Sequence, residues 1–211
     1  MSASFISPPL TLTEIPQPQT LALGVLASGS GSNFEAIAAA IAQQRLNAQI
    51  KVLIYNEPAA LVQNKAQAWN IPAVLLNHRQ YPCREALDQA IVATLQDYGV
   101  EWVIMAGWMR IVTPVLLRAY DQRVLNIHPS LLPSFRGVNA IPQALQAGVK
   151  ITGCTVHYAV AEVDSGPIVM QAAVPILPTD TAATLHARIQ VQEHEIFPTA
   201  IALAAQQASS R

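Results

Sequence analysis

The sequence is poor in charge, in cysteine and in long apolar runs, and each shortage excludes a class of protein. Only 12% of its 211 residues are charged, the net charge is −1 and no basic stripe is present, so a nucleic-acid-binding surface is not indicated. The two cysteines, Cys83 and Cys154, lie far apart, which is typical of reduced thiols. No apolar run reaches the roughly 18–20 residues that span a bilayer.

The composition is sufficient for a large hydrophobic core, because 52% of the residues are hydrophobic. No Cys/His cluster has zinc-binding spacing, so no metal site is expected. Residues 1–20 carry Pro8, Pro9, Pro16 and Pro18 with little periodicity, and we expect an extended leader there. This leader lacks the basic and apolar regions of a signal peptide and the arginines of a transit peptide, so we expect a cytoplasmic protein.

From residue 21 onward, strand-like and helix-like segments alternate. Short apolar runs predict strands at 21–27, 50–55, 73–76, 102–106 and 123–127. Apolar residues at three- and four-residue spacing predict helices at 33–44, 59–69 and 84–98. Such alternation predicts an α/β fold, a mostly parallel twisted sheet with helices on both faces.

The C-terminal part has a different pattern. Residues 151–158 and 168–176 read as two strands with no helix between them, and we expect an antiparallel pair at the edge of the same sheet. Thr179 or Asp180 could cap a final helix that runs to about Ala205. We therefore expect a single domain over 21–205 and a short tail over 206–211.

The Gly-rich segment 28–33 lies where the first strand gives way to the first helix. Its glycines permit a tight turn, and the N–H groups at a helix start favour an anion such as phosphate. The segment lacks the lysine of a P-loop, and Phe34 stands where a dinucleotide fingerprint has its third glycine. A phosphate site is one interpretation of this segment, and a plain Gly-rich turn is the other.

Asn126 and His128 lie at the end of a predicted strand, before a loop that contains two prolines. Alternate side chains of a strand point to one side, so the amide and the imidazole would face a common point. Ligands of open α/β sheets bind at the carboxyl ends of the strands, so a ligand site is one interpretation of this pair, and a hydrogen-bonded structural histidine is the other. Asp164 stands in a Ser-Gly-Pro turn and becomes interesting as a partner of His128, since a carboxylate favours an imidazolium and fixes its orientation.

Six motifs in chain order resemble the phosphoribosylglycinamide formyltransferases, which belong to the folate-dependent formyltransferase family of purine biosynthesis. The motifs are Ser28-Gly-Ser-Gly-Ser-Asn33, Ala106-Gly-Trp-Met-Arg-Ile111, Asn126-Ile-His-Pro-Ser-Leu-Leu-Pro133, Gly153-Cys-Thr-Val-His157, Asp164-Ser-Gly-Pro167 and Gln192-Glu-His194. The resemblance extends over residues 21–205 and implies a Rossmann-like formyltransferase fold.

The resemblance also implies a role for each part of the site. Asn126, His128 and Asp164 would be catalytic. The ribonucleotide substrate would be bound by Gly29, Ser30, Gly31, Ser32, Asn33, Pro129, Gln190 and Glu193. The folate co-substrate, 10-formyltetrahydrofolate, would be bound by Arg84, Met109, Arg110, Ile111 and Val112. No metal would be needed.

The reaction that this assignment implies is direct formyl transfer to the amine of glycinamide ribonucleotide, through a tetrahedral intermediate. The partners would be small molecules only, without nucleic acid or membrane, and the protein would be a monomer or a homodimer. Another folate-dependent formyltransferase or a formyltetrahydrofolate deformylase is the alternative. A nucleotide-linked dehydrogenase is a more distant alternative, and Phe34 breaks the glycine fingerprint that it should have. A non-catalytic nucleotide-binding module is another, and it gives no reason for Asn126, His128 and Asp164 to assemble.

Overall fold

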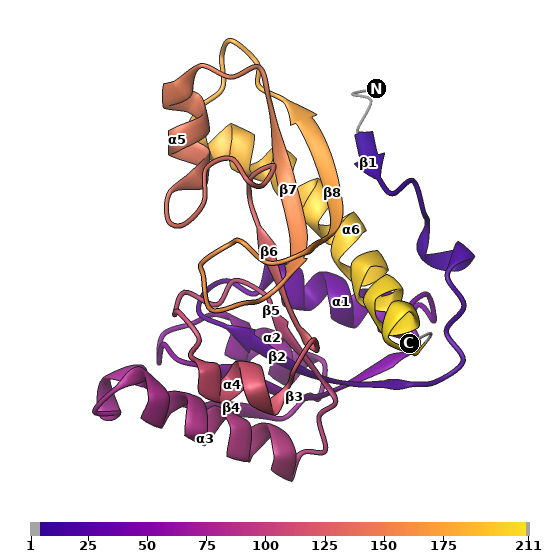
Figure 1. Ribbon diagram of the computed structural model, residues 1–211, viewed down its shortest axis with the longest axis vertical. Coiled ribbons are helices and arrows are strands. Elements are labelled where there is room, and N and C mark those ends of the chain that lie inside the picture. Colours follow the sequence, from indigo (N-terminus) through magenta and orange to yellow (C-terminus); the bar gives the residue numbers. More distant parts are fainter. Residues whose placement is uncertain (1–4, 210–211) are drawn as a thin grey trace. The chain divides into compact units, whose positions relative to one another are not determined.

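The structure, a computed structural model, describes residues 5–209 (Figure 1). These residues divide into two compact units, one made of residues 17–126 and the other of residues 5–16 with 127–209. Each unit is described by itself below. The prediction of a single domain over 21–205 stays a prediction.

The unit of residues 17–126 alternates strands and helices. Its elements are β2 (Leu21–Ala27), α1 (Ser32–Ala42), β3 (Ala48–Tyr55), α2 (Val62–Ala68), β4 (Ala73–Leu75), the 3₁₀ helix η2 (His78–Gln80), α3 (Arg84–Asp97), β5 (Trp102–Met105), α4 (Pro114–Ala119) and the first part of β6 (Val124–His128). The strands lie in the order β4-β3-β2-β5-β6 and all pair in parallel. The predicted strands of this part are therefore confirmed.

The central strands of this unit are apolar along most of their length because both of their faces are covered. All four residues of β5 are buried, and so are the last five residues of β2. Packing explains the glycine at residue 24 in β2, because a Cβ atom there would collide with the side chain of Leu95 on α3. The absence of a side chain at residue 24 thus lets α3 pack closely on the sheet.

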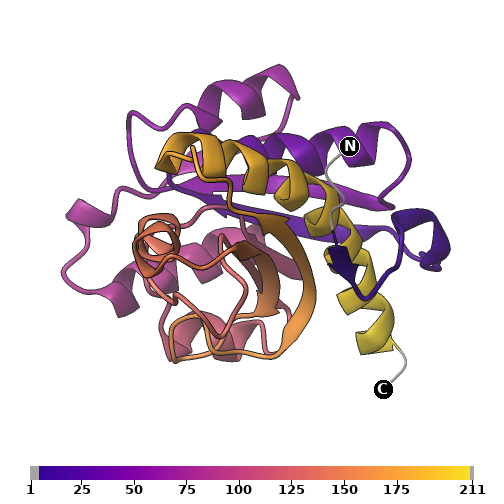
Figure 2. The same ribbon diagram turned by 90° about the horizontal axis from the view of Figure 1, so that it is seen from above.

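The second unit contains an antiparallel arrangement. Its elements are β1 (Phe5–Ser7), the 3₁₀ helix η1 (Leu12–Glu14), the end of β6, α5 (Ala140–Ala147), β7 (Ile151–Tyr158), β8 (Ile168–Pro175) and α6 (Ala182–Ser209). Strand β8 pairs antiparallel with β7 on one side and with β1 on the other. Helix α6 packs along β7 and β8, as Figures 1 and 2 both show.

Strand β6 contributes residues to both units, and the complete strand order is β1-β8-β7-β6-β5-β2-β3-β4. The sheet is parallel from β6 to β4 and has antiparallel strands at its other edge. The predicted fold class, an α/β sheet with antiparallel edge strands in the C-terminal part, is confirmed.

Some elements differ from the sequence-based expectation. The final helix extends to Ser209 instead of ending near Ala205, because residues 206–208 are Gln, Gln and Ala and include no helix breaker. Within the expected leader, Leu12 and Ile15 are buried, while the part of it at residues 1–4 lies outside the described residues. Helices α4 and α5 were not expected. Over residues 5–209, every helix is too short or too polar to cross a membrane.

Candidate active site

The Gly-rich loop joins β2 to α1. Gly31 caps α1 with a left-handed backbone, at a φ of 74°, and Glu35 N–H donates to its carbonyl to begin the helix. A Cβ atom on Gly31 would lie 2.7 Å from the Cβ of Val62, so only glycine fits. The Gly29 carbonyl accepts a hydrogen bond from Val62 N–H at 3.1 Å, which fixes the loop against the start of α2. The positive end of the α1 dipole is therefore presented by a well-supported turn.

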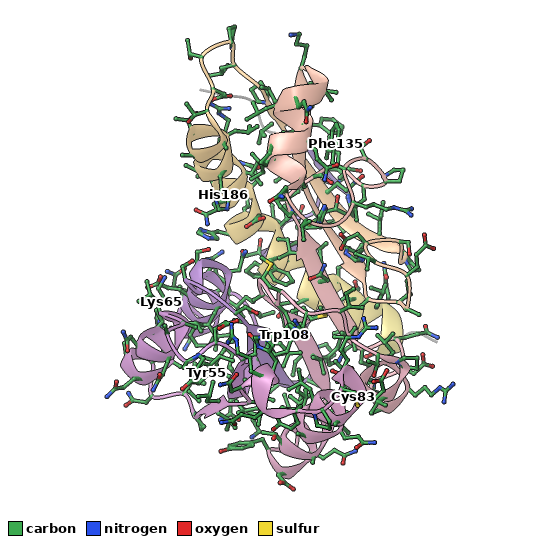
Figure 3. The ribbon with its side chains drawn as sticks, turned by 90° about the vertical axis from the view of Figure 1, so that its left-hand side faces the viewer. Tyr55, Lys65, Cys83, Trp108, Phe135 and His186 are labelled. Carbon is green, nitrogen blue, oxygen red and sulfur yellow. The ribbon has the colours of Figure 1, made fainter. Side chains whose placement is uncertain are left out.

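Ser28 links this loop to the segment that follows β5. Its N–H donates to the Gly107 carbonyl at 3.0 Å, and its hydroxyl oxygen accepts from Met109 N–H at 2.9 Å. The expected folate-binding residues begin here, with Met109 and Ile111 exposed and Val112 buried. Trp108, labelled in Figure 3, is also buried in this segment. Two strand ends of one unit are thus joined by two hydrogen bonds.

Asp88 on α3 fixes the far end of the same segment. Its buried carboxylate accepts a hydrogen bond from Thr113 N–H at 2.5 Å, and the Thr113 side chain caps α4 by accepting from Val115 N–H. Burial raises the pKa of Asp88, and the hydrogen bonds from Thr113 offset only part of that rise. Arg84 lies one helical turn before Asp88, at the start of α3. Sequence reasoning missed Asp88, although an acidic residue between Leu87 and Ile91 on an apolar helix face was a visible signal.

Asp164 lies between two histidines in the second unit. Its Oδ2 is 3.2 Å from His128 Nδ1, and its Oδ1 is 3.5 Å from His157 Nε2. All three side chains are at least nine-tenths buried, and Gly137 N–H donates to Asp164 Oδ2 at 2.8 Å. Burial opposes ionisation of this carboxyl, but the hydrogen bonds from His157 and Gly137 and the charges of the two histidines outweigh it, so the pKa of Asp164 is lowered.

His128 is held at both ring nitrogens. Its Nε2 lies 2.8 Å from the carbonyl oxygen of Phe135, while Nδ1 faces Asp164. A carbonyl oxygen can only accept a hydrogen bond, and an ionised carboxylate also only accepts. Two N–H donors satisfy both contacts, and an imidazole that carries two N–H groups is the cationic imidazolium. The geometry therefore suits a positively charged His128.

A buried polar network supports the loop that follows His128. The Thr155 hydroxyl donates to the Ser130 carbonyl at 2.7 Å and accepts from Leu132 N–H at 3.1 Å. Gln171, which pairs with Thr155 across β7 and β8, donates to the Leu132 carbonyl at 3.0 Å. The loop containing Pro129 is thereby fixed to the antiparallel strands, which limits the positions that the His128 ring can take.

The residues expected to bind the ribonucleotide on α6 are partly buried. Gln190 and Glu193 are three residues apart, so they lie on one face of the helix, and Glu193 is only 5% exposed. Burial raises the pKa of the Cys154 thiol, and the nearby charge of Glu193 raises it further. A buried carboxylate on the helix thus lies close to β7.

The structure places the expected site residues in several groups. It brings Asp164 to His128, as the sequence predicts, and adds His157, the last residue of the Gly153–His157 motif. Asn126 precedes His128 by two residues on β6. The functional assignments of all these residues stay predictions. Among residues 5–209, no group of three or more His, Cys, Asp or Glu side chains could hold a metal ion.

Comparison with known proteins identifies the family. Residues 22–201 match the family model described as formyl transferase. The chain is 42% identical over 177 residues to the phosphoribosylglycinamide formyltransferase of Bacillus subtilis, covering 84% of this chain and 91% of that protein. It is 43% identical over 183 residues to the human trifunctional purine biosynthetic protein adenosine-3, covering 87% of this chain but only 18% of that protein. The chain thus spans about a fifth of the trifunctional relatives.

Solved structures agree with this result. The glycinamide ribonucleotide transformylase 1 of Symbiobacterium toebii is 44% identical, covers 90% of each chain and superimposes with a TM-score of 0.88. The phosphoribosylglycinamide formyltransferase of Bacillus halodurans is 40% identical, with a TM-score of 0.84 over 90% of this chain and 97% of that one. The sequence-based recognition of a formyltransferase is confirmed.

Proposed function

This chain belongs to the formyl transferase family, and from that premise we propose that it transfers the formyl group of 10-formyltetrahydrofolate to the amine of glycinamide ribonucleotide. The observation that carries the proposal is the buried His128–Asp164 pair, in a chain about two-fifths identical to named phosphoribosylglycinamide formyltransferases over most of its length. The match to a formyl transferase model also favours this activity over a nucleotide-linked dehydrogenase.

The Gly-rich loop is proposed to bind the phosphate of the ribonucleotide. Gly31 holds the turn that opens α1, and helix N-termini of this kind attract anions through their N–H groups and their dipole. The other loop members with this role are Gly29, Ser30, Ser32 and Asn33. Pro129, Gln190 and Glu193 are proposed to contact the remainder of the same substrate.

The segment after β5 is proposed to bind the folate. Met109 and Ile111 expose apolar side chains that suit an aromatic ring system, and Arg110 and Arg84 supply positive charge for the carboxylates of a folate tail. Val112, in contrast, is buried. Fixation of this segment by Ser28 and by Asp88 favours a preorganised surface.

The chemical step is nucleophilic attack of the substrate amine on the formyl carbon. Attack forms a C–N bond and places negative charge on the formyl oxygen, and collapse of this intermediate breaks the bond to the folate nitrogen. The Asn126 amide N–H is proposed to donate to the oxyanion, and one such donor contributes about 3–4 kcal/mol in comparable sites. The ring N–H groups of His128 face Asp164 and the Phe135 carbonyl, so its positive charge is proposed to stabilise the same oxyanion electrostatically. Asp164 keeps His128 charged and oriented, and a water molecule beside it could carry the amine proton to the departing nitrogen.

The remaining proposals concern partners and compartment. We propose that the protein binds small molecules only, without nucleic acid or membrane, as a monomer or a homodimer. Both cysteines are free, which fits a reducing compartment such as the cytoplasm.

An absorbance assay for tetrahydrofolate tests the proposed function directly. With 10-formyltetrahydrofolate present, product should accumulate only when glycinamide ribonucleotide is added. Release of formate at the same rate without the amine would contradict the proposal and indicate a deformylase.

A further inference from the structure

The loop after β6 contacts both members of the His128–Asp164 pair through its backbone. The Phe135 carbonyl lies 2.8 Å from His128 Nε2, and two residues later Gly137 N–H donates to Asp164 Oδ2 at 2.8 Å. Phe135 is labelled in Figure 3. A shift of this loop would therefore change the surroundings of His128 and of Asp164 together.

Arg136 stands between these two contacts and reaches the loop that carries Asp164. Its Nη1 donates to Glu162 Oε1 at 3.1 Å. The Ser165 hydroxyl donates to the Glu162 carbonyl at 2.8 Å, which closes a turn around Asp164. A movement of the Glu162 side chain would therefore shift the hydrogen-bonded turn that carries the Asp164 carboxylate.

Both loops hold a residue with a left-handed backbone conformation. Phe135 has a φ of 55° and Asp164 has a φ of 49°, and neither is a glycine. The left-handed region is disfavoured for a bulky residue such as Phe135, whereas aspartate enters it more readily, so the Phe135 conformation in particular depends on neighbouring contacts. The Arg136–Glu162 ion pair joins the two loops next to the hydrogen bond from Gly137 N–H to Asp164.

We propose that the Arg136–Glu162 ion pair positions Asp164 against His128, so that both residues are positioning residues for formyl transfer. The proposal rests on the proposed function, because it assigns the pair an effect on the chemical step. Arg136 is 41% exposed and Glu162 is 75% exposed, so the pair is screened by salt and its effect is modest. An exposed ion pair of this kind corresponds to a change of about two- to five-fold in a rate.

A double-mutant cycle tests the coupling. Arg136→Gln and Glu162→Gln should each lower kcat by about two- to five-fold at low ionic strength, with KM for glycinamide ribonucleotide unchanged. The double variant should lose no more than either single variant, because the same interaction is removed. Unchanged kcat in the single variants, or losses that multiply in the double variant, would overturn the proposal.

Arg45→Gln provides a matched control. Arg45 is exposed and its Nε donates to Gln43, so the substitution removes the same charge at a residue without a role in either loop. Its kcat should equal that of the wild type. Added salt should lower the wild-type kcat toward that of Arg136→Gln and leave the variant unchanged.

Amide hydrogen exchange separates failure of this proposal from failure of the proposed function. If the wild type does not transfer formyl groups to glycinamide ribonucleotide, the assigned function is wrong whatever the variants do. The Gly137 amide should still exchange about two- to five-fold faster in Arg136→Gln than in the wild type, since its bond to Asp164 would open more often. Equal exchange rates would show that the ion pair does not hold the loops together.

Discussion

The Asp164 carboxylate lies 3.2 Å from the imidazole of His128, and both side chains are more than nine-tenths buried. The same carboxylate reaches His157 with its other oxygen and accepts the Gly137 N–H. A buried carboxylate is costly to ionise when it has no partners. Here each of these contacts favours the ionised form of Asp164. The contacts of Asp164 therefore favour an ionised carboxylate next to the His128 ring.

Replacement of Asp164 by asparagine should remove the anion while retaining nearly the same shape. We expect kcat to fall by about 10²–10⁴-fold, because His128 loses the partner that keeps it charged and oriented. Steady-state assays of tetrahydrofolate formation would measure this loss. Asp121→Asn, at an exposed turn, is the control and should retain wild-type kcat. A near-native rate for Asp164→Asn in folded protein would remove Asp164 from the mechanism.

The lowered pKa of Asp164 also predicts how stability depends on pH. Burial opposes ionisation, but the hydrogen bonds and the histidine charges prevail, so the pKa in the folded state lies below the ordinary 3.8. The stabilising contribution is therefore present above pH 3.8 and is lost as the pH falls through the lower, folded-state value. The difference in free energy of unfolding between wild type and Asp164→Asn should decrease over this acid range. Chemical denaturation at several pH values would show it, and a constant difference would contradict the assignment.

Asp88 should behave in the opposite sense. Burial raises its pKa, so its contribution to stability is fully present below the ordinary value of 3.8 and declines as the pH rises through the raised value. Asp88→Asn keeps an acceptor for Thr113 N–H and should be at least as stable as the wild type at pH 7. Asp88→Ala leaves that buried N–H without its acceptor and should lose about 1–3 kcal/mol of the free energy of unfolding. Equal stability of the two variants would exclude a role for this hydrogen bond.

The two glycines of the loop after β2 should differ in their tolerance of a methyl group. Gly31→Ala should lower the free energy of unfolding by about 1–3 kcal/mol, because φ is positive there and the new Cβ would collide with Val62. Gly29→Ala meets no atom within 4 Å and serves as the matched control for stability. Thermal unfolding would measure both. Calorimetric titration with glycinamide ribonucleotide should also show weaker binding to Gly31→Ala, and unchanged affinity would remove the phosphate-binding proposal.

Much of the fold could be predicted because the central strands are covered on both faces. Segments such as 102–106 read as unbroken apolar runs, and their alternation with helical periodicity indicates parallel pairing. Helix α4 was missed even though Thr113 and Pro114 form a recognisable helix start. The helix has six residues, which are too few to show a helical repeat of apolar residues in the sequence.

The site was only partly predictable for a different reason. Asp164 could be assigned to His128 because a carboxylate and an imidazole have matching chemistry. The contact of His128 with Phe135 uses a backbone carbonyl, which every residue type possesses, so no sequence signal exists for it. The contact of His157 with Asp164 depends on how β7 packs against a turn with a left-handed backbone, and strand periodicity does not specify that geometry.

The central claim is that His128, charged and held by Asp164, stabilises the oxyanion of the formyl group in transit. The most direct measurement is single-turnover formyl transfer to glycinamide ribonucleotide by His128→Ala, with both substrates saturating and the folded state verified by circular dichroism. Loss of one such stabilising group predicts a rate about 10²–10³-fold below that of the wild type. A single-turnover rate within a few-fold of the wild type would contradict the account.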